Sequence, residues 1–185
     1  MATRDEHRQH YDAFVTQIQE LCQTPAIRHT LATGRGRPIA QCLDLHKYLS
    51  RRTSGHGARR AHYTVAALIA LDRASLPEPH EGDEAPPDWK RRPNLGTTLA
   101  LAVHTGALNA GPTEDHLQLM RRLTADTLHP LLPHLIDHLL QKGRRPDWAV
   151  LLEDLAQWDY DRGQVATRWL DAYYLTTQPD PYQES

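Results

Sequence analysis

Apolar positions in the first third of the chain recur at the spacing of an α-helix, about 3.6 residues. One such stripe predicts a helix from about Asp5 to Cys22. A short second helix is predicted to begin at Thr24-Pro25, with threonine as the N-cap and proline at the first helical position, and to end near Gly34. Further stripes predict a third helix over residues 39–49 and a fourth over residues 58–72.

The rest of the chain shows stripes of the same kind. They predict a helix over residues 95–103, one from an N-cap at Thr113 to about Asp126, and a strongly apolar one over 131–140 that Lys142-Gly143 ends. Residues 146–177 hold three of the four tryptophans and two stripes, separated by the polar residues 159–163. This pattern predicts two helices in an antiparallel hairpin. Its large aromatic residues fall on the stripes, so we expect core rather than a platform for base stacking: Trp148, Trp169 and Tyr173.

No strand pattern and no internal repeat is visible, so the predicted fold class is all-α. We predict an N-terminal helical domain over residues 1–75, with basic loops at 34–38 and 50–57. A C-terminal bundle of four to five helices is predicted over residues 94–185. Residues 76–93 between them are rich in proline and acidic residues, and we interpret them as a linker or long loop.

The composition indicates a cytoplasmic globular protein. The chain has 185 residues, enough for a substantial core. No stretch approaches the roughly 20 apolar residues of a membrane span, and the polar N-terminus lacks the apolar region of a signal peptide. Cys22 and Cys42 each lie on an apolar stripe, so we expect buried thiols rather than a disulfide or a metal pair.

Charge is unevenly distributed along the chain. The formal net charge is −2, which excludes a globally basic nucleic-acid-binding protein. Residues 28–60 nevertheless contain eight basic side chains against the single acid Asp44, whereas residues 147–185 contain eight acids against two arginines. Such segregation indicates one basic region on an otherwise polar surface.

Phosphate binding requires cations that lack acidic partners. Outside the proline-rich segment, the chain has four arginine pairs at predicted helix ends, loops or polar helical faces, together with isolated basic residues. For any single arginine, a solvated surface charge remains the alternative. The predicted nucleic-acid-binding residues are Arg28, Arg51, Arg52, Arg59, Arg60, Arg121, Arg122, Lys142, Arg144 and Arg145.

Motifs of catalysis are not found. The sequence has no P-loop, dinucleotide-binding glycine motif, paired-cysteine motif, zinc-protease motif or nucleophile elbow, so we predict no catalytic residue, no cofactor and no resident metal. One alternative is a metal-dependent helical enzyme that uses His129, His134 and His138. Another is a helical DNA-binding regulator, although no tight helix-turn-helix signature is visible. Glu153 and Asp154 are interpreted as the exposed face of an amphipathic helix rather than an acid–base pair.

Several motifs in order resemble the CasB family, the small subunit of the type I-E CRISPR surveillance complex Cascade. The strongest is Asp147-Trp148, followed by a leucine-rich helix, Trp158, a polar turn and a last helix that ends in Leu175-Thr176-Thr177. Asn94-Leu95-Gly96 after the proline-rich gap and the Arg121–Asp126 segment match as well, and the N-terminal half fits more loosely. The chain departs from the family pattern at Pro133-His134, where relatives tend to carry an arginine pair.

This resemblance implies a non-catalytic, all-helical subunit with an N-terminal helical domain and a C-terminal bundle. It implies contacts with the backbones of the guide RNA and target DNA, retention of the displaced strand, and association with a second copy and with other Cascade subunits. The positions that fit basic positions of the family are Arg28, Arg59, Arg60, Arg121 and Arg122.

Overall fold

The protein is all-α, as predicted. The computed structural model describes residues 3–73 and 88–178, and this part contains eight α-helices, three short 3₁₀ turns and no strand. None of the helices it contains combines the length and the hydropathy that a bilayer crossing requires. The α-helices are α1 (Arg4–Cys22), α2 (Pro25–Ala32), α3 (His46–Thr53), α4 (Arg59–Leu71), α5 (Leu95–His104), α6 (Ala110–Met120), α7 (Ala125–Gln141) and α8 (Trp148–Thr177).

The predicted start of the third helix is wrong. Residues 39–45 form two 3₁₀ turns, η1 (Ile39–Gln41) and η2 (Leu43–Leu45), and α3 begins only at His46. Cys42 interrupts the helix with φ −110° and ψ 40°, and its thiol lies 3.4 Å from the Pro38 carbonyl oxygen. The predicted basic loop over residues 50–57 is also corrected, because Arg51 and Arg52 lie in the last turn of α3.

Three further helix boundaries differ from the prediction: both ends of α6, and the start of α7, which begins at Ala125 rather than near Leu131. Helix α6 begins at Ala110 after the cap residue Asn109, so Thr113 lies inside the helix rather than at its N-cap, and its hydroxyl donates to the Asn109 carbonyl oxygen at 2.7 Å. Pro112 is tolerated there because first-turn N–H groups have no intrahelical partner. Helix α6 ends at Met120 rather than near Asp126, and the next helix begins at Ala125. Gly143, with φ 69°, follows the end of α7 as predicted.

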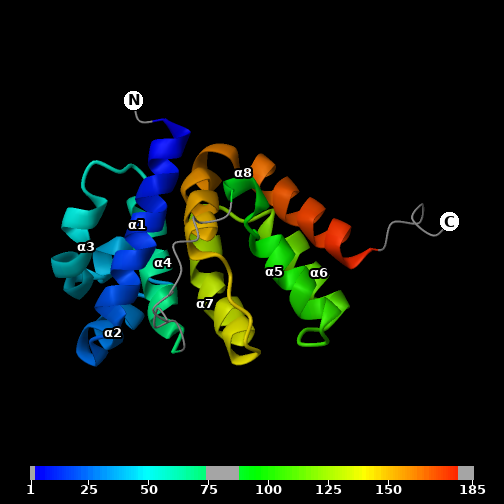
Figure 1. The fold of residues 1–185 in the computed structure, drawn as a ribbon, viewed down its shortest axis with the longest axis horizontal. Helices are drawn as coiled ribbons and strands as arrows, with labels where there is room; N and C mark the ends of the chain where they lie inside the picture. The colour runs from blue at the N-terminus through cyan, green and yellow to red at the C-terminus, as the bar shows by residue number, and fades with distance from the viewer. Residues whose placement is uncertain (1–2, 74–87, 179–185) are drawn as a thin grey trace.

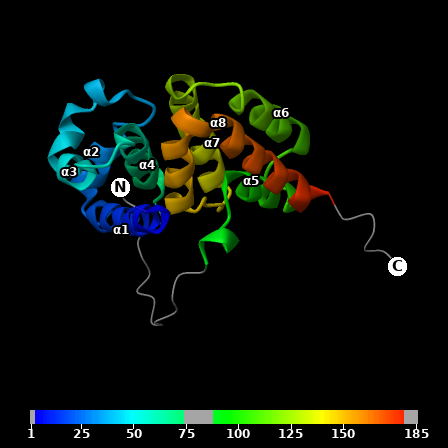
Figure 2. The ribbon, with the colours of Figure 1, turned by 90° about the horizontal axis from the view of Figure 1, so that it is seen from above.

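Helix α8 occupies the centre of the molecule. It contacts α1, α4, α5, α6 and α7, and Figures 1 and 2 show it between the α1–α4 group and the α5–α6 pair. The two helices of the predicted hairpin are present, and they meet at a kink inside the predicted break: only Asp161 leaves the helical conformation, at φ −146° and ψ 53°. The two halves diverge from this bend in a V, as Figure 1 shows, rather than lying antiparallel. Each half can therefore cover a different part of the core.

The aromatic residues on the predicted stripes of α8 lie in the core, as predicted. Trp148, Trp169 and Tyr173 are buried, and the Trp169 ring packs on the Trp158 ring with centroids 5.0 Å apart. The indole nitrogen of Trp158 donates to the Leu123 carbonyl oxygen at 3.0 Å. Buried indoles need such acceptors, so this hydrogen bond and the ring contact hold the bend of α8 against the α6–α7 connection.

Glu153 and Asp154 are buried, so their interpretation as an exposed face was wrong. Glu153 accepts hydrogen bonds from Arg8 at 3.1 Å and from the Trp89 indole at 2.8 Å. Asp154 accepts from the Trp169 indole at 2.6 Å, and burial raises the pKa of this carboxyl group although that bond and the nearby arginine lower it. Residues 148–156 of α8 are buried all round, so polar positions in this part of the helix must find partners inside the protein.

Both cysteines are buried and free, as predicted. The division into two domains stays a prediction: residues 76–87 of the proposed linker lie outside the described residues, and the buried core runs from Tyr11 on α1 to Tyr173 on α8. The segment after this gap is placed, with a 3₁₀ turn η3 (Trp89–Arg91) against α1 and α8.

Candidate nucleic-acid interface

A basic groove lies where α2, the ends of α1 and α4, and α7 meet. Its volume is about 820 Å³, and its charged lining consists of four arginines and the single carboxylate of Asp137. We call this the basic groove and define it by Arg28, Arg35, Arg37 and Arg73. Among the described residues, none of the four makes an ion pair. The groove therefore presents cations without acidic partners, as phosphate binding requires.

Arg28 is held in place from one side only. Its Nε donates to the Ala70 carbonyl oxygen at 3.0 Å, which satisfies one of the last carbonyl groups of α4. Its Nη2 atom is buried and has no hydrogen-bond partner. The Nε atoms of Arg59 and Arg60, at the other end of α4, are buried without a partner in the same way, so the groove is distinguished by its unpaired charges rather than by this atom.

The loop after α2 brings two more cations to the groove. Gly36 has φ 68°, a left-handed conformation that favours glycine, and a β-carbon there would lie 3.4 Å from the Pro130 Cα of α7. This tight turn against α7 leaves Arg35 and Arg37 on either side of it, where both line the groove. Pro130 and Pro133, near the position where the chain departs from the family pattern, thus form the surface on which the loop rests.

The other end of α4 holds a second basic group. Arg59 donates from Nη2 to the Ser50 hydroxyl at 3.2 Å and to the Tyr63 hydroxyl at 3.3 Å, and it lies over the Tyr63 ring. Arg60 forms an ion pair with Asp126 at the start of α7. Arg121 and Arg122 follow α6 close to this point, are exposed and make no ion pair in the described part of the chain. Half of this predicted group is therefore partnered within the protein.

The residues after α7 form a third predicted group. Arg145 donates to the buried carboxylate of Asp72 at 2.6 Å, which links this segment to the end of α4. Lys142 is exposed and Arg144 is half-buried. Because Arg73 follows Asp72 directly, this group borders the basic groove.

Helices α4 and α7 explain why the predicted residues separate. They run side by side in the same direction: Arg60 pairs with Asp126 at their starts, the Thr64 hydroxyl lies 2.6 Å from Nδ1 of His129, and Arg145 pairs with Asp72 at their ends. The 13 residues of α4 span about 20 Å at about 1.5 Å per residue. The structure thus places Arg28, Lys142, Arg144 and Arg145 at one end and Arg59, Arg60, Arg121 and Arg122 at the other.

Arg51 and Arg52 lie in a separate hollow between α1 and α3. This histidine hollow has a volume of about 570 Å³ and is lined by His10, Ala13, Phe14, Gln17, Arg51, Arg52, Ser54 and His56. Burial, together with the neighbouring histidines, lowers the pKa of His10 to about 4. Burial also lowers the pKa of His62, which lies behind His10, to about 4, although its hydrogen bond to the Ala58 carbonyl oxygen acts the other way. Both imidazoles are therefore neutral at pH 7.

The histidines of the alternative metal site are not assembled into one. His129 is buried beside Thr64, and burial lowers its pKa to about 4. His134 and His138 instead line an apolar cavity of about 300 Å³ between α6 and α7. Among residues 3–73 and 88–178, no group of three or more histidine, cysteine or carboxylate side chains could hold a metal ion.

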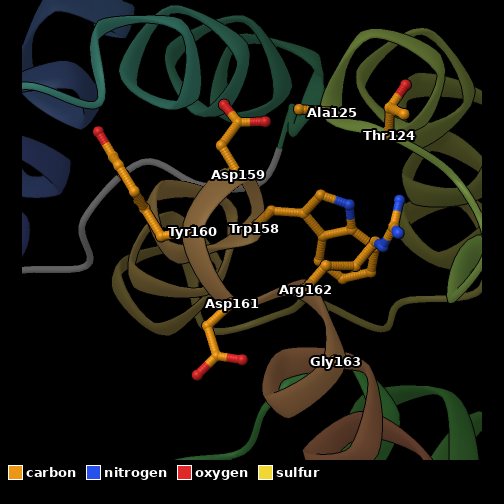
Figure 3. Close-up of a pocket in the computed structure, with 8 residues that line it drawn as sticks. All are labelled: Thr124, Ala125, Trp158, Asp159, Tyr160, Asp161, Arg162 and Gly163. Atoms are coloured by element: carbon orange, nitrogen blue, oxygen red, sulfur yellow. The ribbon is translucent and has the colours of Figure 1, made fainter.

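A further hollow, of about 380 Å³, lies at the bend of α8 and is shown in Figure 3. Arg162 donates to the Leu123 carbonyl oxygen at 3.2 Å, the same oxygen that accepts from the Trp158 indole, and Figure 3 shows the two side chains together. Tyr160 points away from them. Asp159 and Asp161 supply two negative charges against one arginine. This hollow therefore lacks the charge of a phosphate site.

Sequence reasoning left three residues of the basic groove out of the predicted set. Arg35 and Arg37 belong to the basic segment 28–60 but stand alone rather than in pairs. Arg73 directly follows the predicted end of α4. Two signals could have found them. Arg35 and Arg37 lie in a glycine-rich basic loop, and Arg73 is a basic residue next to a predicted helix end.

Comparisons with known proteins concern the family and the fold of the chain. A family model described as "CRISPR-associated protein Cse2" matches residues 28–174. A solved structure titled "CRISPR RNA-guided surveillance complex" contains a similar chain, with 33% identity and a TM-score of 0.77 over 92% of this chain and 95% of the other. A second, titled "CRISPR RNA-guided surveillance complex, pre-nicking", gives 34% identity and a TM-score of 0.79 over 92% and 94%. No curated protein matches the chain.

Proposed function

The chain belongs to the CRISPR-associated Cse2 (CasB) family, and from this membership we propose that it is the non-catalytic small subunit of a type I-E Cascade complex. In this role it contacts the backbones of guide RNA and target DNA, stabilises the R-loop in antiviral defence, and acts in the cytoplasm. Its protein partners are a second copy of itself and the other subunits of the complex.

The observation that carries this proposal is the charge of the basic groove. Four arginines surround a space of about 820 Å³ with one carboxylate among them, and none of the four makes an ion pair among the described residues. Such a groove binds phosphates by charge and by release of counterions, and it does not read bases. Exchange of a DNA duplex for an RNA–DNA duplex is nearly balanced in free energy, so backbone contacts of this kind can tip it.

The test is a charge reversal of three groove arginines, Arg35→Glu, Arg37→Glu and Arg73→Glu, in the assembled complex. Target-DNA affinity is measured at several salt concentrations. We expect weaker binding and a shallower dependence of log K on log salt, by about 0.9 for each phosphate that the protein no longer neutralises. A matched control reverses three exposed cations outside the groove, Lys47, Lys90 and Arg91, which changes the net charge equally.

The two variants separate local contact from overall charge. If the groove variant keeps both the affinity and the salt slope of the wild type, the groove does not contact nucleic acid. If groove and control variants weaken binding equally, only the net charge matters and the assignment of the groove is overturned.

A further inference from the structure

The histidine hollow shares no lining residue with the basic groove. Its lining contains two arginines and two histidines but no carboxylate. Arg52 is fixed there, because Nε donates to the Gln17 amide oxygen at 3.1 Å and Nη1 donates to the Tyr48 carbonyl oxygen at 2.6 Å. Arg51 is exposed and makes no ion pair within the described residues. The hollow can therefore accept an anion without displacing an acidic partner.

A pair of stacked rings lies beside these cations. The imidazoles of His10 and His56 have centroids 3.4 Å apart and planes inclined by 9°, so they lie face to face. His56 belongs to the loop between α3 and α4, between Gly55 and Gly57, and a β-carbon added at either glycine would meet no atom within 4 Å. One face of the His56 ring is thus covered by His10, and the residue lines the hollow together with Arg51 and Arg52.

A hydrogen-bond chain holds the stack from behind. Nδ1 of His62 lies 2.8 Å from the Ala58 carbonyl oxygen, so it must carry the proton and donate it. Nε2 of His62 is then an acceptor, and Nε2 of His10, at 2.9 Å, donates to it. This chain fixes the plane of the His10 ring, against which His56 is stacked. An aromatic platform with a fixed plane loses little conformational entropy when a further ring joins it.

We propose that the histidine hollow binds one nucleotide of a single-stranded nucleic acid, with its base stacked on His56 and its phosphate held by Arg51 and Arg52. Histidine is one of the aromatic residues on which unpaired bases stack, and stacking tolerates any base sequence. This inference rests on the proposed function and adds to it a second contact, which requires an unpaired base and not only a phosphate backbone.

The experiment compares two fluorescein-labelled strands of equal length by fluorescence anisotropy with the full chain. One strand is oligothymidylate, and the other has abasic sites throughout, so both carry the same phosphates. We expect the wild type to prefer the thymidine strand by about five-fold or more. His56→Ala removes this preference without changing affinity for the abasic strand, whereas His56→Phe keeps it. Arg51→Gln weakens the binding of both strands.

The outcomes separate this inference from the proposed function. Equal binding of both strands by the wild type, or an unchanged preference in His56→Ala, overturns the inference and leaves the proposed function standing. Absence of binding to either strand counts against both proposals. If free thymidine monophosphate displaces the strand as well as unlabelled oligothymidylate does, the hollow is a site for free nucleotides, and the proposal of a strand contact is overturned.

Discussion

Gly96 of α5 faces the Trp169 carbonyl of α8 so closely that a β-carbon on Gly96 would lie 1.9 Å from that oxygen. The two helices can approach this far only because glycine has no side chain. Nearby, the Asn94 side-chain amide donates to the Arg168 carbonyl oxygen at 3.2 Å, which fixes the same crossing. The Asn94-Leu95-Gly96 motif thus sets the distance between α5 and the second half of α8.

Gly96→Ala is expected to destabilise the protein by about 3 kcal/mol or more, because the methyl group meets backbone rather than a movable side chain. The measurement is the free energy of unfolding in urea. Gly111→Ala in α6 is the matched control, since a β-carbon there meets no atom within 4 Å. We expect this control to leave stability unchanged or to raise it by up to about 1 kcal/mol. A small effect in Gly96→Ala, equal to that of the control, would contradict the close approach.

Trp89 packs the 3₁₀ turn η3, which follows the proline-rich stretch, against α1 and α8. The guanidinium groups of Arg8 and Arg92 both lie over its ring, with Cζ atoms 5.0 and 4.4 Å from the ring centroid, and its indole donates to Glu153 at 2.8 Å. Trp89→Phe keeps the cation–π contacts and removes the hydrogen bond. We expect it to cost about 1–3 kcal/mol of unfolding free energy, because hydrogen bonds to charged groups are worth about this much.

Trp89→Ala should cost more than Trp89→Phe, because it also removes the aromatic contacts. Both free energies are measured by urea denaturation. Tyr160→Phe serves as the control, since Tyr160 is 84% exposed and should leave stability unchanged. If Trp89→Phe matched this control, the indole hydrogen bond would contribute nothing, and the attachment would depend on ring contacts alone.

Mild acid is expected to destabilise the protein through its buried histidines. The folded-state pKa values of His62 and His129 are lowered to about 4 from an ordinary value of 6.5, chiefly by burial. Between these pH values the unfolded chain binds more protons than the folded protein, so the free energy of unfolding falls as pH falls. Each such histidine contributes a slope of about 1.4 kcal/mol per pH unit in the middle of this window and none well above pH 6.5.

The check is the free energy of unfolding at several values of pH between 4 and 8. His62→Asn keeps a donor near the Ala58 carbonyl oxygen and removes the titrating ring, so it should reduce the slope between pH 4 and 6.5. His104→Asn, at an exposed position, is the control and should leave the slope as it is. A slope equal in both variants and the wild type would show that His62 does not carry the acid sensitivity.

Periodicity in the sequence predicted the helices and most of the core, because apolar stripes depend on local spacing alone. It placed Trp148 and Trp169 correctly inside the protein. It failed at Glu153, whose partners Arg4 and Arg8 lie more than 140 residues away along the chain. The surroundings of a central helix come from distant segments, and its buried carboxylates look the same in sequence as exposed ones.

The sequence predicted that arginines form the candidate interface, but it did not predict which arginines lie together. An excess of arginine over residues 28–60 identified the basic half, and Arg28 lies in the basic groove. Whether an arginine is available depends on what it meets in three dimensions. Arg60 meets Asp126, 66 residues later, and Arg145 meets Asp72, 73 residues earlier, so both charges are partly neutralised within the protein.

This difference between paired and unpaired arginines predicts unequal effects of two neutralising substitutions. Arg37→Gln should weaken target-DNA binding by the assembled complex and reduce its salt slope by about one, because Arg37 lines the basic groove without an acidic partner. Arg60→Gln should change both quantities less, because the Asp126 carboxylate already offsets the charge of Arg60. Affinity is measured for both variants at the same set of salt concentrations.

Asp126→Asn is the control for this comparison. It removes the partner of Arg60, and because Asp126 is largely exposed we expect stability to fall by no more than about 1 kcal/mol. Nucleic acid confined to the basic groove would leave affinity nearly unchanged in this variant, since the two ends of α4 are about 20 Å apart. A larger effect of Arg60→Gln than of Arg37→Gln, together with tighter binding in Asp126→Asn, would instead place the strand at the end where α4 and α7 begin.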